Sequence, residues 1–248
     1  MAACFPSRAL ADSTGWPDER SAGPFVCHAD FRLDQHGRLL RQIAELEREL
    51  NETLQIGESQ ESIHLFLFAK KATYQRYMKR HFPAVPYRRA LFVKNGGPGM
   101  VFVYRNREFE VDVRHESTHA LLHASLPMVP LWLDEGLAEY FEVPPDKRAG
   151  GNPHMTALKW SIRLSRAPRL TDLEAVHGLD KMGGAQYRHA WAWVHFMLHG
   201  PPEAREELIN FLGDIRSHTP PGRLSQRLKG RLPDLNRRFI GHFKRWQR

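Results

Sequence analysis

The sequence has little cysteine and no long apolar run. Its 248 residues include only two cysteines, Cys4 and Cys27, which excludes the disulfide framework that holds small secreted domains together. A single pair does not define the redox compartment, and neither cysteine has the spacing of a zinc ribbon. No apolar stretch approaches the roughly 20 residues that a membrane-spanning helix needs. We therefore expect no membrane partner.

The N-terminus also lacks the marks of a leader. No basic stretch followed by a long apolar stretch occurs in the first 20 residues, so a secretory signal peptide is not indicated. This favours a cytoplasmic protein, although a mis-assigned start would give a secreted or periplasmic protein the same appearance. Residues 1–22 are rich in small, polar and charged residues, and we expect them to be disordered.

The positive charge is concentrated at the C-terminus. The chain has a net charge of +8, yet residues 215–248 alone hold ten Lys or Arg and one acid, Asp234. Phe239, Phe243 and Trp246 recur there at helical spacing, which predicts a basic helical extension packed on the rest of the protein. A solvated helical face explains these charges more simply than nucleic acid, although nucleic acid stays an alternative partner. The oligomeric state is not indicated.

The remaining residues, 23–214, are interpreted as one α+β domain. The NGGPG turn at residues 95–99 lies between two apolar runs and predicts a hairpin. A mixed first half and a helical second half are typical of an α+β arrangement. Apolar patterns predict strands at 25–28, 63–68, 90–93 and 100–104, and helices at 32–54, 72–81, 107–124, 134–142, 153–165, 185–199 and 202–215, with one or two more in the tail.

The central motif is His115-Glu116-Ser117-Thr118-His119, on the helix expected at 107–124. Histidines four residues apart lie on one helical face, so both imidazoles can reach one metal ion. Glu116 lies one step around the helix, where it can contact a metal-bound water without being a ligand. The motif therefore predicts two zinc ligands and a catalytic base within one helical turn.

A third ligand is expected from the segment WLDEGLAEYF that follows. Catalytic zinc usually has three protein ligands and an open position for water. Glu135 lies at the start of the helix expected from Asp134, and Glu139 is four residues further on the same face. We expect Glu135 to be the third ligand and Glu139 to orient a ligating histidine. The simpler alternative is that acids favour a helix N-terminus.

HESTH followed by WLDEGLAEYF resembles the gluzincin branch of zinc peptidases, and in detail the peptidase-MA-like group. The resemblance covers roughly residues 60–200 and includes the segment Tyr187-Arg188-His189-Ala190-Trp191. It implies a zincin-like fold, with a twisted sheet packed on the active-site helix and a helical lobe in the second half. It also implies that Met100–Tyr104 is the edge strand beside the cleft, where an extended peptide substrate adds to the sheet.

The resemblance further implies that Tyr187 donates a hydrogen bond to the tetrahedral oxyanion, although packing between helices explains this residue equally well. The gap from His119 to Glu135 is shorter than in the classical aminopeptidases, and no motif for binding a substrate N-terminus is present. Endopeptidase and exopeptidase activity therefore both stay open. His123 continues the histidine series, but eight helical residues span about 12 Å, too far for His115 and His123 to share an ion.

Three functions follow from these observations. The first is zinc-dependent hydrolysis of peptide bonds, with Zn²⁺ as cofactor, a peptide or protein as substrate, and Glu116 as base. The second is a zinc-binding domain of the same fold that binds peptides or proteins without cleaving them. The third is a nucleic-acid-associated protease docked by its basic tail. Glu116 favours the first over the second, because a structural zinc site needs no base.

Overall fold

The computed structural model describes residues 15–59 and 61–246. The chain divides into two compact units: Met1–Glu47 with Ser59–Ala124, and Arg48–Glu58 with Ser125–Arg248. The first contains all the strands of the described residues and the second is helical, so the prediction of an α+β fold with a helical second half is confirmed. The units do not coincide with the predicted division at residues 22 and 214.

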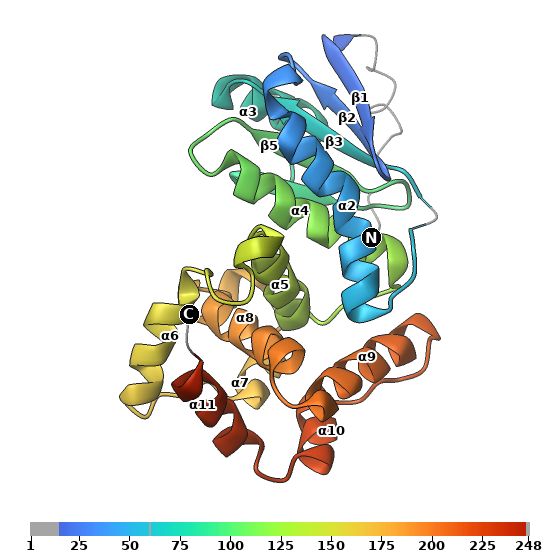
Figure 1. The fold of residues 1–248 in the computed structure, drawn as a ribbon. Helices are drawn as coiled ribbons and strands as arrows, with labels where there is room; N and C mark the ends of the chain where they lie inside the picture. The colour runs from blue at the N-terminus through green and yellow to red at the C-terminus, as the bar shows by residue number, and fades with distance from the viewer. Residues whose placement is uncertain (1–14, 60, 247–248) are drawn as a thin grey trace. The chain divides into compact units, whose positions relative to one another are not determined.

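The first unit is built on a five-stranded mixed sheet of order β1-β2-β3-β5-β4 (Figure 1). Antiparallel pairs form at both edges, β1 with β2 and β4 with β5, and the inner pairs β2–β3 and β3–β5 are parallel. The strands are β1 (Asp18–Ala22), β2 (Phe25–Ala29), β3 (Ile63–Phe68), β4 (Ala90–Val93) and β5 (Met100–Tyr104).

Two expectations about this sheet were wrong. Asp18–Ala22 is an edge strand and not a disordered segment, because its backbone pairs with Phe25–Ala29 across a tight turn. The rest of the segment expected to be disordered, residues 1–14, lies outside the described residues. Met100–Tyr104 is not an edge strand: it lies between β3 and β4, and Ala90–Val93 forms that edge. The hairpin was predicted correctly, but not which of its strands would pair with β3.

Both faces of the sheet are buried by helices. Phe66 and Phe102 stack on one face within an aromatic cluster that includes Tyr74 of α3 (Lys71–His81). Side chains alternate along a strand, so Leu65 and Val101 point to the opposite face, where they are also buried. Two further helices belong to this unit in whole or part: α2 (Gly37–Leu54), preceded by a 3-10 turn at Asp34–His36, and α4 (Phe109–Ser125).

The second unit is centred on α8 (Gly184–His199), in which every side chain from Ala190 to Met197 is buried. Helix α5 (Leu131–Phe141) packs against it at Gly136, because a Cβ atom there would lie 2.8 Å from the backbone of Ala190. The other helices are α6 (His154–Arg163), α7 (Leu170–Glu174), α9 (Pro202–Arg216), α10 (Leu224–Arg231) and α11 (Leu235–Arg245), with 3-10 turns at Pro145–Lys147 and Leu179–Lys181.

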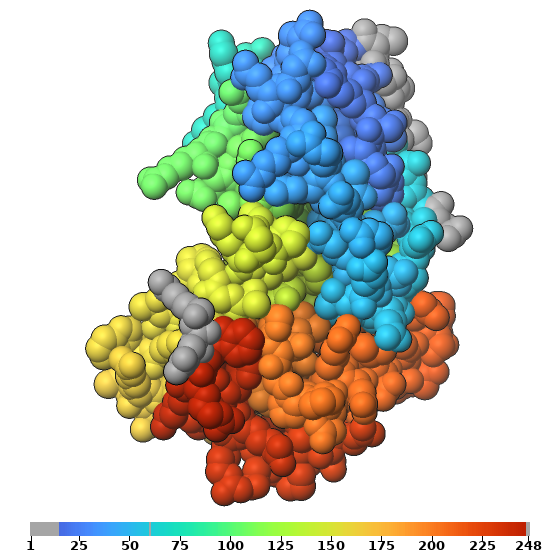
Figure 2. Space-filling view, viewed as in Figure 1, coloured from blue at the N-terminus to red at the C-terminus, as the bar shows by residue number. Residues whose placement is uncertain are grey.

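The basic tail forms the last two of these helices, shown in red in Figure 2. Its aromatic residues pack inward: the Phe239 ring stacks on Trp193 of α8 with centroids 4.3 Å apart, and Phe243 is buried as well. The prediction that these aromatics serve packing is confirmed. None of the helices in the described residues is both long enough and apolar enough to cross a membrane.

Candidate metal centre

Helix α4, which carries the HESTH motif, is held in place by hydrogen bonds of buried polar side chains. Near its start, the buried carboxylate of Asp112 accepts hydrogen bonds from Arg89 at 2.6 Å and from the side chain of Asn106 at 3.0 Å. Two residues on, the buried guanidinium of Arg114 donates to Gln42 of α2 at 3.0 Å. The side chain of Asn106 also accepts a hydrogen bond from the N–H of Glu108 in the turn before α4. These contacts set the rotation of the helix about its axis.

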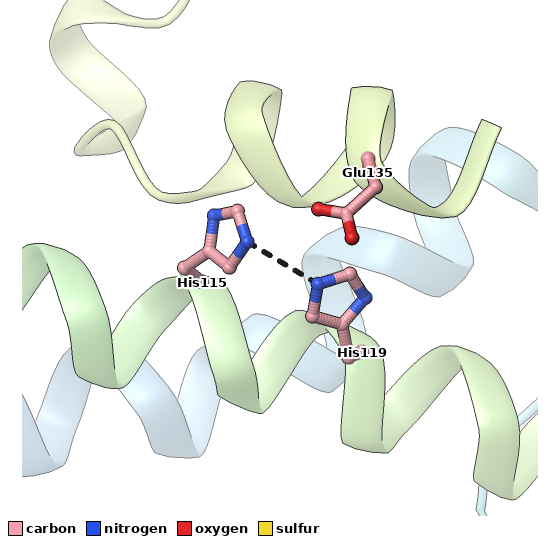
Figure 3. A group of neighbouring side chains, drawn as sticks. All are labelled: His115, His119 and Glu135. Carbon is pink, nitrogen blue, oxygen red and sulfur yellow. Dashed lines mark hydrogen bonds between the residues drawn. The ribbon is translucent and has the colours of Figure 1, made fainter. Parts of the chain in front are cut away.

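The two histidines of the motif converge as a metal pair would. Nε2 of His115 lies 3.2 Å from Nε2 of His119, and the ring planes meet at 75° (Figure 3). Two zinc ligands at 2.0–2.1 Å in tetrahedral geometry would be about 3.3 Å apart. The observed separation therefore fits two nitrogens aimed at one ion.

The protonation of this pair follows from its geometry. A hydrogen bond between two Nε2 atoms needs one of them to carry a proton. A metal ion would take both lone pairs and leave each ring protonated at Nδ1. His119 is buried and His115 is half-buried, so the pair is largely withdrawn from water. Glu116, the expected base, follows His115 in the sequence, and its side chain is half-buried.

Glu135 belongs to the second unit, on α5, and the start of that helix was predicted one turn too late. Pro130, with a φ of −57°, precedes the first helical residue, Leu131, and its carbonyl accepts the N–H groups of Leu133 and Asp134. Glu135 therefore lies in the second turn and is only 5% exposed. A buried carboxylate is costly unless it is compensated. A simple preference of acids for an exposed helix start does not explain its burial.

Among the described residues, two sets of side chains could each hold a metal ion. One is His115, His119 and Glu135, drawn in Figure 3; the other is His115, Glu139 and Glu142. The first set has two imidazoles and one carboxylate, as in catalytic zinc sites. The second is richer in oxygen, which suits harder cations. Sequence reasoning did not consider Glu142, although Glu139 and Glu142 lie three residues apart and hence on one helical face.

No protein-family model matches the chain, and no curated protein matches it. Among solved structures, it is similar to the crystal structure of an M1 zinc metallopeptidase from Deinococcus radiodurans, with 12% sequence identity and a TM-score of 0.38. The match covers 92% of this chain and 50% of the other, so this chain spans about half the length of that peptidase. So distant a likeness assigns no activity to this chain.

Glu139 has a partner that was not anticipated. Its Oε2 atom lies 2.9 Å from Nε2 of His154, the first residue of α6, and both side chains are largely buried. The backbone carbonyl of Glu139 also accepts a hydrogen bond from Asn152, at 3.1 Å. Glu139 thus joins α5 to α6 within the second unit. Its expected role beside a zinc-binding histidine stays a prediction.

The other candidate side chains are placed as follows. Tyr187 lies half-buried in the first turn of α8. His189, two residues on, is half-buried too, and burial lowers its pKa. The backbone carbonyl of His123 accepts a hydrogen bond from Lys94 at 2.9 Å, and His123 belongs to neither of the two sets that could hold a metal. His195 is fully buried, and its Nε2 lies 2.8 Å from the carbonyl oxygen of Ala149, so it packs in the core.

Proposed function

We propose that this protein hydrolyses peptide bonds with a zinc ion held by His115, His119 and Glu135. The observation that carries the proposal is the 3.2 Å separation of the two histidine Nε2 atoms on α4. The two nitrogens share a hydrogen bond at this distance, and the same geometry directs both of them towards one point where an ion could bind. With a metal, this separation is what tetrahedral coordination requires.

The chemistry of the donors supports zinc in particular. Calcium and magnesium prefer oxygen ligands throughout, whereas two imidazoles and one carboxylate suit zinc in a peptidase setting. Three protein ligands leave the fourth position open to water, as a catalytic site needs. A structural zinc site would be closed by a fourth protein ligand.

The remaining residues supply the other parts of a hydrolytic site. Zinc bound there would lower the pKa of a bound water towards about 7. Glu116 would accept a proton from the attacking water and then deliver it to the leaving amine. Tyr187 donates a hydrogen bond to the oxyanion that develops on the carbonyl oxygen. Glu116 also favours catalysis over binding alone, because a zinc site that only binds has no use for a base between its ligands.

Replacing Glu116 with glutamine tests this assignment. Glu116→Gln keeps the size of the side chain and removes the base, so we expect turnover of a quenched-fluorescent peptide library to fall at least about a hundredfold while zinc is retained. Glu110→Gln is the matched control: it changes an exposed acid on the same helix and should leave both unchanged. Full activity in Glu116→Gln would overturn the role of the base, and loss of zinc would place Glu116 among the ligands.

A further inference from the structure

A chain of three polar side chains crosses the first strands of the sheet, apart from the residues of the candidate metal centre. Oε1 of Glu19 on β1 lies 2.8 Å from Nδ1 of His28 on β2. Nε2 of His28 lies 2.9 Å from Nδ1 of His64 on β3. All three residues belong to the first unit. No sequence motif predicts this arrangement.

The order of donors and acceptors in this chain starts from Glu19. An ionised glutamate only accepts, so Nδ1 of His28 must donate to Glu19. In the singly protonated form of His28 with its proton on Nδ1, Nε2 accepts, and Nδ1 of His64 donates to it. Burial lowers the pKa of His64, which keeps its ring neutral at neutral pH. The result is a lone pair on Nε2 of His64, a hydrogen-bond acceptor set in place by its neighbours.

That acceptor is open to a ligand. Within the described part of the chain, Nε2 of His64 has no hydrogen-bond partner. It is also not among the fully buried side-chain atoms that lack a partner, so solvent can reach it. His64 lines a cavity of about 640 Å³ in the first unit, a volume within the usual range for small-molecule sites. The other lining residues are Glu61, Ser62, Lys94, Gly96, Gly97 and Pro98.

Another part of the lining already holds a carboxylate, that of Glu61. Nζ of Lys94 lies 2.9 Å from Oε2 of Glu61, a side chain that is 47% exposed. Among the described residues, the N–H groups of Gly96 and Gly97 donate to no acceptor, and open space surrounds both glycines. Gly96 has a φ of +66°, a left-handed conformation that glycine adopts without strain. The cavity lining thus contains an ammonium, two amides without an acceptor in the described chain, and an exposed glutamate carboxylate paired with the ammonium.

We propose that this cavity binds a small carboxylate that also carries an N–H donor, the chemistry of the C-terminal residue of a peptide. The carboxylate displaces Glu61 from Lys94 and accepts hydrogen bonds from the amides of Gly96 and Gly97. The N–H group donates to Nε2 of His64. Charge pairing and directed hydrogen bonds then act together, as in other small-ligand sites. The inference does not depend on the proposed peptidase activity, because the cavity contains none of the proposed metal ligands.

Titration of the ¹⁵N-labelled full chain with three probes tests the proposal. N-acetylglycine has both groups, propionate lacks the N–H donor, and N-acetylglycinamide lacks the carboxylate. N-acetylglycine should shift the amide resonances of Gly96 and Gly97 saturably. Propionate should bind about tenfold more weakly, the worth of one directed hydrogen bond, and N-acetylglycinamide should not bind.

Three variants separate the parts of the site. Lys94→Met should abolish binding of N-acetylglycine, and Glu61→Gln should tighten it several-fold, since a competing carboxylate is removed. His64→Leu should bring N-acetylglycine down to the affinity of propionate; if that variant does not fold, the comparison of the two probes on the wild type still tests the acceptor. No saturable shift with N-acetylglycine, equal shifts with N-acetylglycinamide, or an unchanged affinity in Glu61→Gln would each overturn the proposal.

Discussion

Gly136 of α5 lies so close to Ala190 of α8 that a methyl group on it would be 2.8 Å from the carbonyl carbon and oxygen of that residue. The obstruction is backbone, which cannot move aside as a flexible side chain can. The glycine directly after Glu135 is therefore required by helix packing. It allows α5, which carries the proposed third ligand, to pack directly on the buried helix α8.

Gly136→Ala should destabilise the protein by about 1–3 kcal/mol, the usual cost of overpacking a core. Urea unfolding followed by circular dichroism measures this change. Gly213→Ala is the matched control, since Gly213 is an exposed glycine within α9 with nothing near its Cβ position. There alanine should stabilise by roughly 0.5–1 kcal/mol. Equal stability of the two variants would show that α5 and α8 are not in this close contact.

The contact between Glu139 and His154 predicts a measurable coupling. Their side chains meet at 2.9 Å and are 14% and 23% exposed. A double-mutant cycle with Glu139→Ala and His154→Ala should give a coupling energy of about 1 kcal/mol in the free energy of unfolding. His154→Ala should leave zinc content unchanged, because His154 is not a proposed ligand. Strictly additive effects would mean that the two side chains do not interact in solution.

Much of this architecture follows from local patterns. The helix bearing HESTH was expected at 107–124 and spans Phe109–Ser125, because apolar spacing and the Asn106 turn are local signals. The strand Asp18–Ala22 carries four polar residues and one alanine, so composition predicted disorder. Only its pairing with Phe25–Ala29, a tertiary feature, makes it a strand.

The candidate site likewise has features that local sequence predicts and features that it does not. The spacing of His115 and His119 on one helical face is a local property, and it predicted their convergence. The partnership of Glu139 with His154 joins residues 15 apart across a turn, and the order of strands β3, β5 and β4 depends on which strand a crossover meets. Neither has a periodic signal, so sequence patterns did not predict the first, and the family resemblance placed Met100–Tyr104 wrongly at the edge.

The buried histidines of the second unit predict a loss of stability in mild acid. Burial lowers the pKa of His195 to about 3 and of His242 to about 4, and Nδ1 of His195 lies 3.1 Å from Nε2 of His242. Below the pKa of an unfolded histidine, near 6.5, the unfolded chain binds protons that the folded chain excludes. Their stabilising contribution is therefore complete above about pH 7 and falls as the pH drops towards the folded values.

Each such histidine should reduce the free energy of unfolding by about 1.4 kcal/mol per pH unit in this window. Urea unfolding between pH 7.5 and pH 5.0 largely separates the histidines from the carboxylates, which titrate at about 4 when unfolded, although His64, His189 and His199, whose pKa burial also lowers, add to the slope. The measurement is made in EDTA, so that release of a bound metal does not contribute to the slope. His242→Gln keeps a hydrogen-bond donor for His195. It should reduce the pH dependence of the free energy of unfolding by the contribution of one histidine. A free energy of unfolding that does not vary between pH 7.5 and 5.0 would contradict the burial of these rings.

Zinc content is the most direct test of the proposed metal centre. Elemental analysis of the purified chain should find about one zinc per molecule, as a single three-ligand site requires, and His115→Ala and Glu135→Ala should each lose most of it. His123→Ala, on the same helix but outside the proposed ligand set, should retain it. No zinc in the wild type after reconstitution, or zinc that survives His115→Ala, would contradict the account.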